Sequence, residues 1–264
     1  MHKSPYHGFS VEFSEHRAYG PGDEIRHIDW KLWGKTERYY VKQFEEETNL
    51  RSHILLDQSR SMAYKSGEIS KLEYAQMLSA SLAYLMIKQQ DAAGLTLFDS
   101  KVRSFVPSRS KSSHLNVILG QMNKIKPGPE TDIAPILHQS AEAIKKRGLI
   151  ILVSDLFDEP EDIVTGLKHF RHKGHEVIVF QILDPQELEL DFTDRTLFRD
   201  METREEIITE PWHIQNDYQK NMRGYCDFIQ RQCRQNMIDY VRLTTDQPLD
   251  LALSEYLIKR KRIG

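Results

Sequence analysis

One segment of the chain places an aspartate and two serines at alternating positions, directly after an apolar run. The run ends at Asp57, and Ser59 and Ser61 follow it. A short apolar run bounded by polar residues is typical of a fully buried strand. The carboxylate and the two hydroxyls at its end are oxygen ligands, which a hard cation such as Mg²⁺ prefers. The same spacing also occurs in ordinary turns and helix caps, so the motif alone leaves both interpretations open.

The chain after residue 52 alternates between strand-like and helix-like segments. The expected strands cover residues 53–57, 93–98, 102–106, 149–153, 176–183 and 239–244. The expected helices cover residues 71–90, 114–125, 131–147 and 214–237, with another before residue 176 and a last one from Leu249. A turn at Asp99 makes the second and third strands a hairpin. This alternation indicates a doubly wound α/β fold, in which a mostly parallel sheet with one antiparallel edge strand is covered on both faces.

The first 52 residues have a different character. They are polar and aromatic, with a Pro-Gly turn at residues 20–23 and a strand-like stretch at residues 39–44. These patterns predict a small, partly β N-terminal extension (residues 1–52), which we expect to pack on the main domain (residues 53–264). Within the main domain, residues 191–211 form an irregular insert that is compatible with a second hairpin.

The composition argues against several classes of partner. The chain has 264 residues, of which 39% are hydrophobic, and its formal net charge is −3. That balance gives no reason to expect a nucleic-acid or anionic-membrane partner. The longest mostly apolar segment, residues 75–87, is too short to cross a bilayer, and no secretion signal opens the chain. We therefore expect a cytoplasmic protein without direct membrane insertion, in which Cys226 and Cys233 stay reduced.

The predicted sheet brings further oxygen ligands toward the opening motif. Asp155, like Asp57, follows a strand, and Thr131 begins a helix that enters from the same edge. The carboxyl ends of parallel strands share one edge, and a crevice forms there where the strand order reverses. Asp57, Ser59, Ser61, Thr131 and Asp155 can therefore converge on one centre. Taken singly, Thr131 and Asp155 could each be no more than a helix cap.

These residues resemble the metal-ion-dependent adhesion site of von Willebrand factor type A domains. A second resemblance, to the bacterial "domain of unknown function 58" family, extends along nearly the whole chain. Its motifs stand here as Arg17-x-Tyr19-x-Pro21-Gly22-Asp23, Arg26-x-Ile28-Asp29-Trp30-Lys31, Val41-Lys42-Gln43-Phe44, Lys71-Leu72-Glu73-Tyr74-Ala75, Ser154-Asp155 and Val179-Phe180-Gln181-x-Leu183-Asp184.

The resemblance implies a metal-dependent protein–protein interaction module. Asp57, Ser59, Ser61 and Thr131 match positions that bind Mg²⁺ or Mn²⁺ directly or through water, and Asp155 matches one that usually acts through water. The remaining coordination position in such sites takes an acidic side chain of a protein partner. Genes of the family are typically associated with MoxR-type AAA+ ATPases. The implied partner is therefore such an ATPase or its client, and the implied role is chaperone-like or in assembly. The protein would reach the inner face of the membrane only through its partners.

An enzymatic alternative stays open at this stage. Asp57 could be the nucleophile of a metal-dependent phosphohydrolase. Enzymes that use a strand-end aspartate in this way need an acid two residues later, and the chain has Ser59 there. No Gly-rich phosphate loop or Ser–His–Asp order accompanies the motif, so we expect no hydrolytic activity.

Three other groups of residues could suggest a functional site but have simpler structural interpretations. His169, His172 and His175 are spaced by three, but no cysteine or carboxylate supports a zinc site there. The basic residues 259–262 are explained by favourable charge at a helix C-terminus. The charges around the Pro-Gly turn indicate a structural ion-pair network rather than a catalytic cluster; they are Arg17, Asp23, Arg26 and Asp29.

Overall fold

The computed structural model of the chain describes residues 10–23, 25, 28–47, 50–128, 133–199, 206–250, 253, 254 and 257. Its internal contacts separate two compact units, with the boundary between Leu50 and Arg51. The predicted packing of the N-terminal extension on the main domain stays a prediction.

The N-terminal unit is an antiparallel strand pair with one short helix. Strand β1 (Ser10–Ala18) pairs with β2 (Tyr40–Glu47), and α1 (Trp30–Thr36) lies between them in sequence. Asp29 begins the helix, because its Oδ1 accepts the backbone N–H groups of Lys31 and Leu32, each at 3.0 Å. Its Oδ2 lies 3.0 Å from His16 Nε2.

The ion pairs expected around the Pro-Gly turn are present in part. Arg17 Nη2 pairs with Asp23 Oδ1 at 2.7 Å, and Gly20 N–H donates to Asp23 Oδ2 at 2.8 Å. These contacts close the turn and favour a structural role for both charges. Arg26 lies outside the described residues.

The main domain is built on a six-stranded sheet in the order β10-β7-β6-β3-β4-β5. Its strands are β3 (Arg51–Asp57), β4 (Ala92–Phe98), β5 (Val102–Arg109), β6 (Leu149–Ser154), β7 (Glu176–Leu183) and β10 (Asp239–Thr244). All neighbouring pairs are parallel except β4 and β5, which form the expected antiparallel hairpin at one edge. The chain runs outward from β3 to β5 and then returns to β6 on the other side of β3. The carboxyl ends of β3 and β6 therefore lie side by side where the strand order reverses, which is where such sheets form a crevice.

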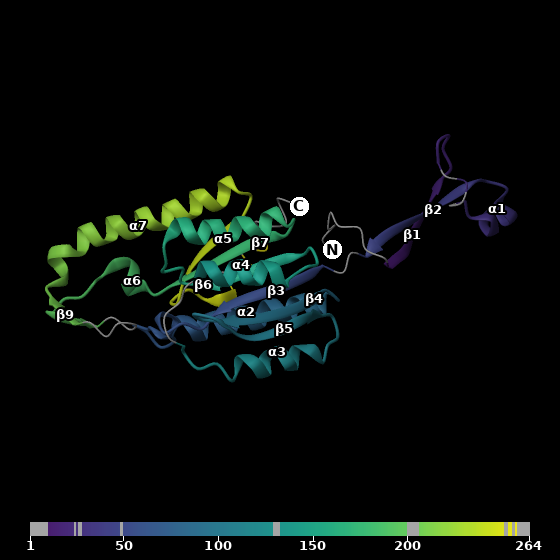
Figure 1. Cartoon of the computed structure of the whole chain (residues 1–264). Helices are drawn as coiled ribbons and strands as arrows, with labels where there is room; N and C mark the ends of the chain where they lie inside the picture. The colour runs from purple at the N-terminus through teal and green to yellow at the C-terminus, as the bar shows by residue number, and fades with distance from the viewer. Residues whose placement is uncertain are drawn as a thin grey trace. The chain divides into compact units, whose positions relative to one another are not determined.

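Helices cover both faces of this sheet (Figure 1). Helices α2 (Lys71–Lys88) and α3 (His114–Met122) contact one another and the β3–β5 half of the sheet. Helices α4 (Ile133–Ala143), α5 (Pro160–His172) and α7 (Pro211–Gln235) cover the other face, where their apolar side chains pack against Leu55, Ile150, Leu152, Val177 and Val179. The doubly wound α/β fold predicted from the sequence is confirmed.

Helix α2 begins where the sequence predicts but is less buried than expected. Ser70 and Glu73 form a capping box, in which each side chain bonds the backbone of the other. Its buried residues form a broad stripe, and one face is exposed at Glu73, Met77, Tyr84 and Lys88, so the helix is not buried all round, contrary to what its apolar sequence indicated. One of these buried residues is Lys71, in the first turn, and this lysine contributes to the candidate site below.

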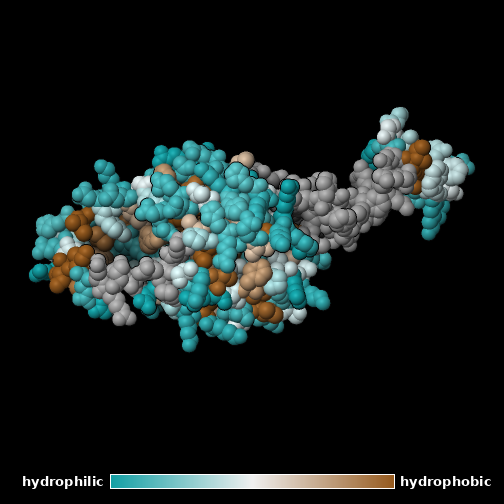
Figure 2. Space-filling model, viewed as in Figure 1, coloured by the Kyte–Doolittle hydropathy of each residue, from teal (hydrophilic) through white to brown (hydrophobic). Residues whose placement is uncertain are grey.

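The segment between β7 and α7 contains elements that the sequence left undefined. A short helix, α6 (Pro185–Glu189), follows β7 directly and was not predicted. Strands β8 (Thr196–Arg199) and β9 (Glu206–Thr209) then form the second hairpin considered for this insert. Exposed apolar side chains gather on the hairpin and the first turn of α7: Leu197, Ile207, Ile208, Trp212 and Ile214. Brown atoms are visible at this end of the main domain in Figure 2.

The second half of the main domain differs from expectation mainly at element ends. Helix α4 is described from Ile133 and ends at Ala143, so it ends before the predicted residue 147, whereas its predicted start at residue 131 lies outside the described residues. Cys226 and Cys233 are both buried free thiols on α7. Within the described residues no helix is long and apolar enough to span a bilayer.

Removing residues 1–47 is expected to lower the melting temperature of the protein. Trp30, Trp33 and Tyr39 are all exposed, so the small unit does not bury its own aromatic surface. Each such ring removes about 150–250 Å² from water when it is covered. Calorimetry on the full chain and the shortened chain checks this. An unchanged melting temperature would show that the extension does not pack on the main domain.

His53 is a buried histidine within β3. Its Nε2 lies 2.7 Å from Thr96 Oγ1 on β4, and its ring stacks on Phe105 of β5 with centroids 5.0 Å apart. Burial, with a smaller contribution from His175, lowers the pKa of His53 to about 4. The folded protein therefore holds this ring neutral at pH values where the unfolded chain protonates it.

Acidification is expected to destabilise the protein through His53. Between about pH 6.5, the ordinary pKa, and about pH 4, the unfolded chain binds a proton that the folded state does not, so stability falls as the pH falls. Urea denaturation at about pH 7.5 and about pH 5 measures this loss. His53→Gln should reduce the loss, whereas His172→Gln, at an exposed position, should not. Equal losses in both variants would rule out His53 as the cause.

Candidate functional site

Asp57 lies at the end of β3, beside the end of β6. Its side chain is fully buried. Oδ2 accepts the Ser154 hydroxyl at 2.7 Å, and Oδ1 accepts the Ser59 backbone N–H at 2.8 Å. These contacts fix the carboxylate at the point where the strand order reverses.

The two serines of the motif lie next to this carboxylate. Ser61 begins the short 3-10 helix η2 (Ser61–Ala63), and its Oγ lies 3.0 Å from Ser59 Oγ. The hydroxyl of Ser59 also forms a hydrogen bond with the Asp57 carboxylate, and this bond by itself favours a lower pKa of Asp57. The structure thus brings Asp57, Ser59 and Ser61 together.

Asp155 follows β6 and is almost completely buried. Its Oδ2 accepts Lys71 Nζ at 2.8 Å, and the same ammonium lies 2.5 Å from Glu187 Oε1 of α6. Lys71 is itself fully buried, and its Nζ lies 4.8 Å from the centre of the Phe157 ring. An ammonium placed between the buried carboxylate of Asp155 and the partly buried carboxylate of Glu187 is therefore part of the site.

Lys71 was not among the residues predicted for the site, although the sequence contains a signal for it. A cation in the first turn of a helix is unfavourable, because the helix dipole is positive there. Its presence at that position in α2 indicates a specific anionic partner. Burial alone would lower the pKa of Lys71, but Asp155 and Glu187 outweigh burial and the pKa is raised.

Glu187 is positioned by the capping box of α6. Its Oε2 accepts the Asp184 backbone N–H at 2.9 Å, which leaves Oε1 for Lys71. The Asp184 carboxylate accepts Gln186 N–H at 2.9 Å and Ser66 N–H at 2.8 Å, so it ties the loop after η2 to α6. The Asp-Pro-x-Glu sequence that starts α6 is a capping signal, and sequence reasoning missed it.

The charges in this region do not balance within the protein. Burial, and then the negative charge of Asp155, raise the pKa of Asp57 to about 7. Its carboxylate accepts hydrogen bonds from Ser154 and Ser59, which are neutral donors. Lys71 pairs with Asp155 and Glu187, so a negative charge on Asp57 has only neutral donors beside it among the described contacts. A buried charge without a partner is costly, so this geometry favours an added cation.

Thr131 lies outside the described residues, but the segments on either side of it are fixed near the site. Gly128 N–H donates to the carbonyl of Gln58, the residue after Asp57, at 2.8 Å. Ile133 N–H donates to Asp158 Oδ2 at 2.8 Å, in the loop after Asp155. A Cβ on Gly128 would lie 2.0 Å from Asp99 Oδ2, so only glycine permits this close approach.

The donor set suits a hard divalent cation better than a metal such as zinc, which prefers nitrogen and sulfur ligands. In the part of the chain that the structure describes, no three His, Cys, Asp or Glu residues form a metal-binding group. The site instead offers the carboxylates of Asp57 and Asp155 and the hydroxyls of Ser59 and Ser61, a set that Mg²⁺ can complete with water. The fully buried Asp57 carboxylate, which lacks a cation, provides the charge for such an ion.

The histidines considered for zinc do not gather. His169 Nδ1 lies 2.9 Å from His138 Nδ1 on α4, and its Nε2 lies 3.1 Å from Glu142. His172 is exposed, and His175 is buried at the start of the next strand. The structure therefore brings none of the three together as a metal site.

The strand order, the antiparallel edge and the strand-end site define a doubly wound α/β domain of the von Willebrand factor A-like class. The chain belongs to the family described as "Protein of unknown function DUF58", whose model matches residues 15–224. This finding confirms the family resemblance seen in the sequence.

Relatives support the family and the fold. The chain is 23% identical over 260 residues to the uncharacterized protein Rv1480 of Mycobacterium tuberculosis (strain ATCC 25618 / H37Rv), covering 97% of this chain and 81% of that protein. Among solved structures, an aerotolerance-related membrane protein of Bacteroides fragilis aligns with a TM-score of 0.55 and 18% identity, over 78% of this chain and 96% of that chain. The conserved hypothetical protein BatB of Bacteroides thetaiotaomicron aligns with a TM-score of 0.54 and 21% identity, over 81% of this chain and 99% of that chain. At these identities the likeness shows a shared fold.

Replacing Lys71 by Met is expected to lower the free energy of unfolding by about 3–5 kcal/mol, because the buried Asp155 and the partly buried Glu187 would lose their counter-charge. Urea denaturation measures the loss. Lys88→Met provides the matched control, since Lys88 ends the same helix and is exposed. If the two variants lost the same stability, the buried ammonium would not be important for the fold.

Proposed function

We propose that the main domain is a metal-dependent protein-interaction module. The observation that carries this proposal is the fully buried Asp57 carboxylate at the reversal point of the sheet. It lies next to two hydroxyls, and among the described residues its hydrogen-bond partners are neutral. The von Willebrand factor A-like fold supports it, because its loops present this edge for binding. We propose Mg²⁺ or Mn²⁺ as the ion.

In this proposal the ion is held by Asp57, Ser59, Ser61 and Thr131, with Asp155 acting through water. When bound, the ion supplies an electrophilic position for an oxygen ligand from outside. The chain's own residues have other tasks. Ser154 orients the Asp57 carboxylate, and Lys71 holds Asp155 in place through Oδ2.

The proposed ligand from outside is an acidic side chain of a protein partner. Mg²⁺ requires about six oxygen ligands in octahedral geometry, more than the protein residues supply, and a carboxylate would add the negative charge that neutral hydroxyls lack. The family resemblance suggests a MoxR-type AAA+ ATPase or its client as partner, in a chaperone-like or assembly role. We propose that this interaction takes place in the cytoplasm.

Magnesium is expected to raise the melting temperature of the wild-type protein, relative to the protein in chelator. At an Mg²⁺ concentration about 100 times the Kd, binding adds about 2.7 kcal/mol to stability. For a domain of this size that corresponds to a shift of about 5–10 °C. Asp57→Asn should abolish the shift, whereas Asp191→Asn, at an exposed position, should keep it. If magnesium had no effect on the wild-type protein, the proposed metal dependence would be wrong.

The same variants distinguish the interaction module from the enzymatic alternative. Capture of a protein partner from cell extract should require Mg²⁺ and should fail with Asp57→Asn but not with Asp191→Asn. Magnesium-dependent release of phosphate from an aryl phosphate, lost in Asp57→Asn, would instead favour the phosphohydrolase.

A further inference from the structure

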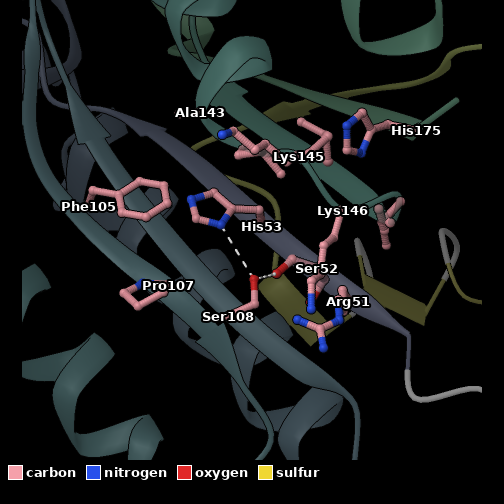
Figure 3. Close-up of a pocket in the computed structure, with 14 residues that line it drawn as sticks. Arg51, Ser52, His53, Phe105, Pro107, Ser108, Ala143, Lys145, Lys146 and His175 are labelled. Atoms are coloured by element: carbon pink, nitrogen blue, oxygen red, sulfur yellow. Dashed lines mark hydrogen bonds between the residues drawn. The ribbon is translucent and has the colours of Figure 1, made fainter. Parts of the chain in front are cut away.

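A pocket lies at the opposite edge of the main sheet from Asp57. It has a volume of about 250 Å³ and is formed by the first residues of β3 and β6, the last residues of β5, and the segment that follows α4. Figure 3 shows side chains of β5 on one side of His53 and residues from the end of α4 onward on the other. At roughly 30 Å³ for each water molecule in the liquid, this volume is enough for a small organic molecule.

The inner wall of the pocket is a hydrogen-bonded set of polar side chains. Ser108 Oγ donates to the Ser52 carbonyl at 2.7 Å and lies 3.5 Å from His53 Nδ1. A Cβ on Gly94 would approach His53 Nδ1 to 2.6 Å and Ser108 Oγ to 2.7 Å, so glycine is needed for this packing. The half-exposed ring of Phe105, stacked on His53, provides an aromatic wall beside these polar groups.

His175 also lines the pocket, and one of its ring nitrogens has no protein partner. The residue is 1% exposed, and although its ring approaches the backbone of Ile144 and Gly148, Nδ1 completes no hydrogen bond with the described residues. A buried polar atom in this state is costly unless a ligand or a water molecule pairs with it. This nitrogen indicates that the pocket is built to receive a polar group.

Three cationic side chains surround the opening of the pocket. Arg51 is contributed by β3, and Lys145 and Lys146 follow the end of α4. All three are exposed, and none forms an ion pair within the described ranges. The negative end of the α4 dipole, equivalent to about half an elementary charge, offsets only a part of this positive charge.

We propose that this pocket binds a small organic phosphate, with the phosphate among Arg51, Lys145 and Lys146 and the organic part against Phe105. A phosphate dianion matches several cations, whereas a single carboxylate would leave at least two of them without a partner. The volume exceeds what a phosphate group alone requires, and an aromatic wall favours a flat organic substituent. A phosphate oxygen accepts a hydrogen bond from His175, whose neutral ring then carries its proton on Nδ1. The proposal concerns a different edge of the sheet and does not depend on the metal site.

The experiment is a calorimetric titration of the full chain with three probes, in chelator and at constant ionic strength: inorganic phosphate, phenyl phosphate and benzoate. We expect phenyl phosphate to bind most tightly and to shift the NMR signals of the His175 ring. The double variant Lys145→Ala, Lys146→Ala should weaken this binding by at least about tenfold. The control is Lys124→Ala, Lys126→Ala, which removes the same charge from exposed positions that do not line the pocket.

Three results would overturn the proposal. Absence of binding by phenyl phosphate would show that the pocket has no such ligand. An equal loss of affinity in both double variants would show a general charge effect rather than a site. Benzoate binding as tightly as phenyl phosphate would assign the pocket to carboxylates. Binding that depends on Lys145 and Lys146, with a shift at His175, supports the proposal.

Discussion

The placement of charge at the carboxyl ends of β3 and β6 is the constraint on which the surrounding structure depends. Asp57 ends β3 and Asp155 directly follows β6. Both residues are buried because these two strands are central in the sheet. Lys71 must reach into the protein to meet Asp155, and this requires the first turn of α2 to lie directly over the sheet edge. Glu187 must meet the same ammonium, so α6 has to start immediately after β7. Buried ions of this kind tolerate little displacement, because any gap leaves a charge without a partner.

The two edges of the sheet consequently have opposite electrostatic character. The carboxyl edge has an excess of buried carboxylate around one ammonium, and the amino edge has exposed cations around neutral histidines. Strand β3 connects the two, since His53 lies near its start and Asp57 ends it. A parallel sheet offers both edges to binding, although its loops make the carboxyl edge the usual choice. A single domain of this type can therefore present two chemically distinct sites that share their central strand.

Much of the fold could be predicted from sequence because it depends on local patterns. The apolar run that forms β6 is continuous, and β7 and β10 have the predicted bounds. The Asp57 motif was found because its residues are neighbours in the chain. Lys71 and Glu187 were missed because they are 116 residues apart and meet only in the folded protein. His175 was considered only as part of a histidine series, since nothing local shows that its Nδ1 is buried without a partner.

The pairing of Lys71 with Asp155 also bears on how a cation would be held. Lys71 occupies Asp155 Oδ2, and Oδ1 faces the Phe157 N–H at 3.4 Å, so this carboxylate is already neutralised in part by the protein. An ion beside Asp57 would then receive the full charge of Asp57 alone, with hydroxyls and water as its other ligands. Such an ion stays short of negative charge and attracts a further carboxylate more strongly than it would if Asp155 were free. The buried ammonium would thus favour capture of an acidic partner over closure of the site by the protein's own residues.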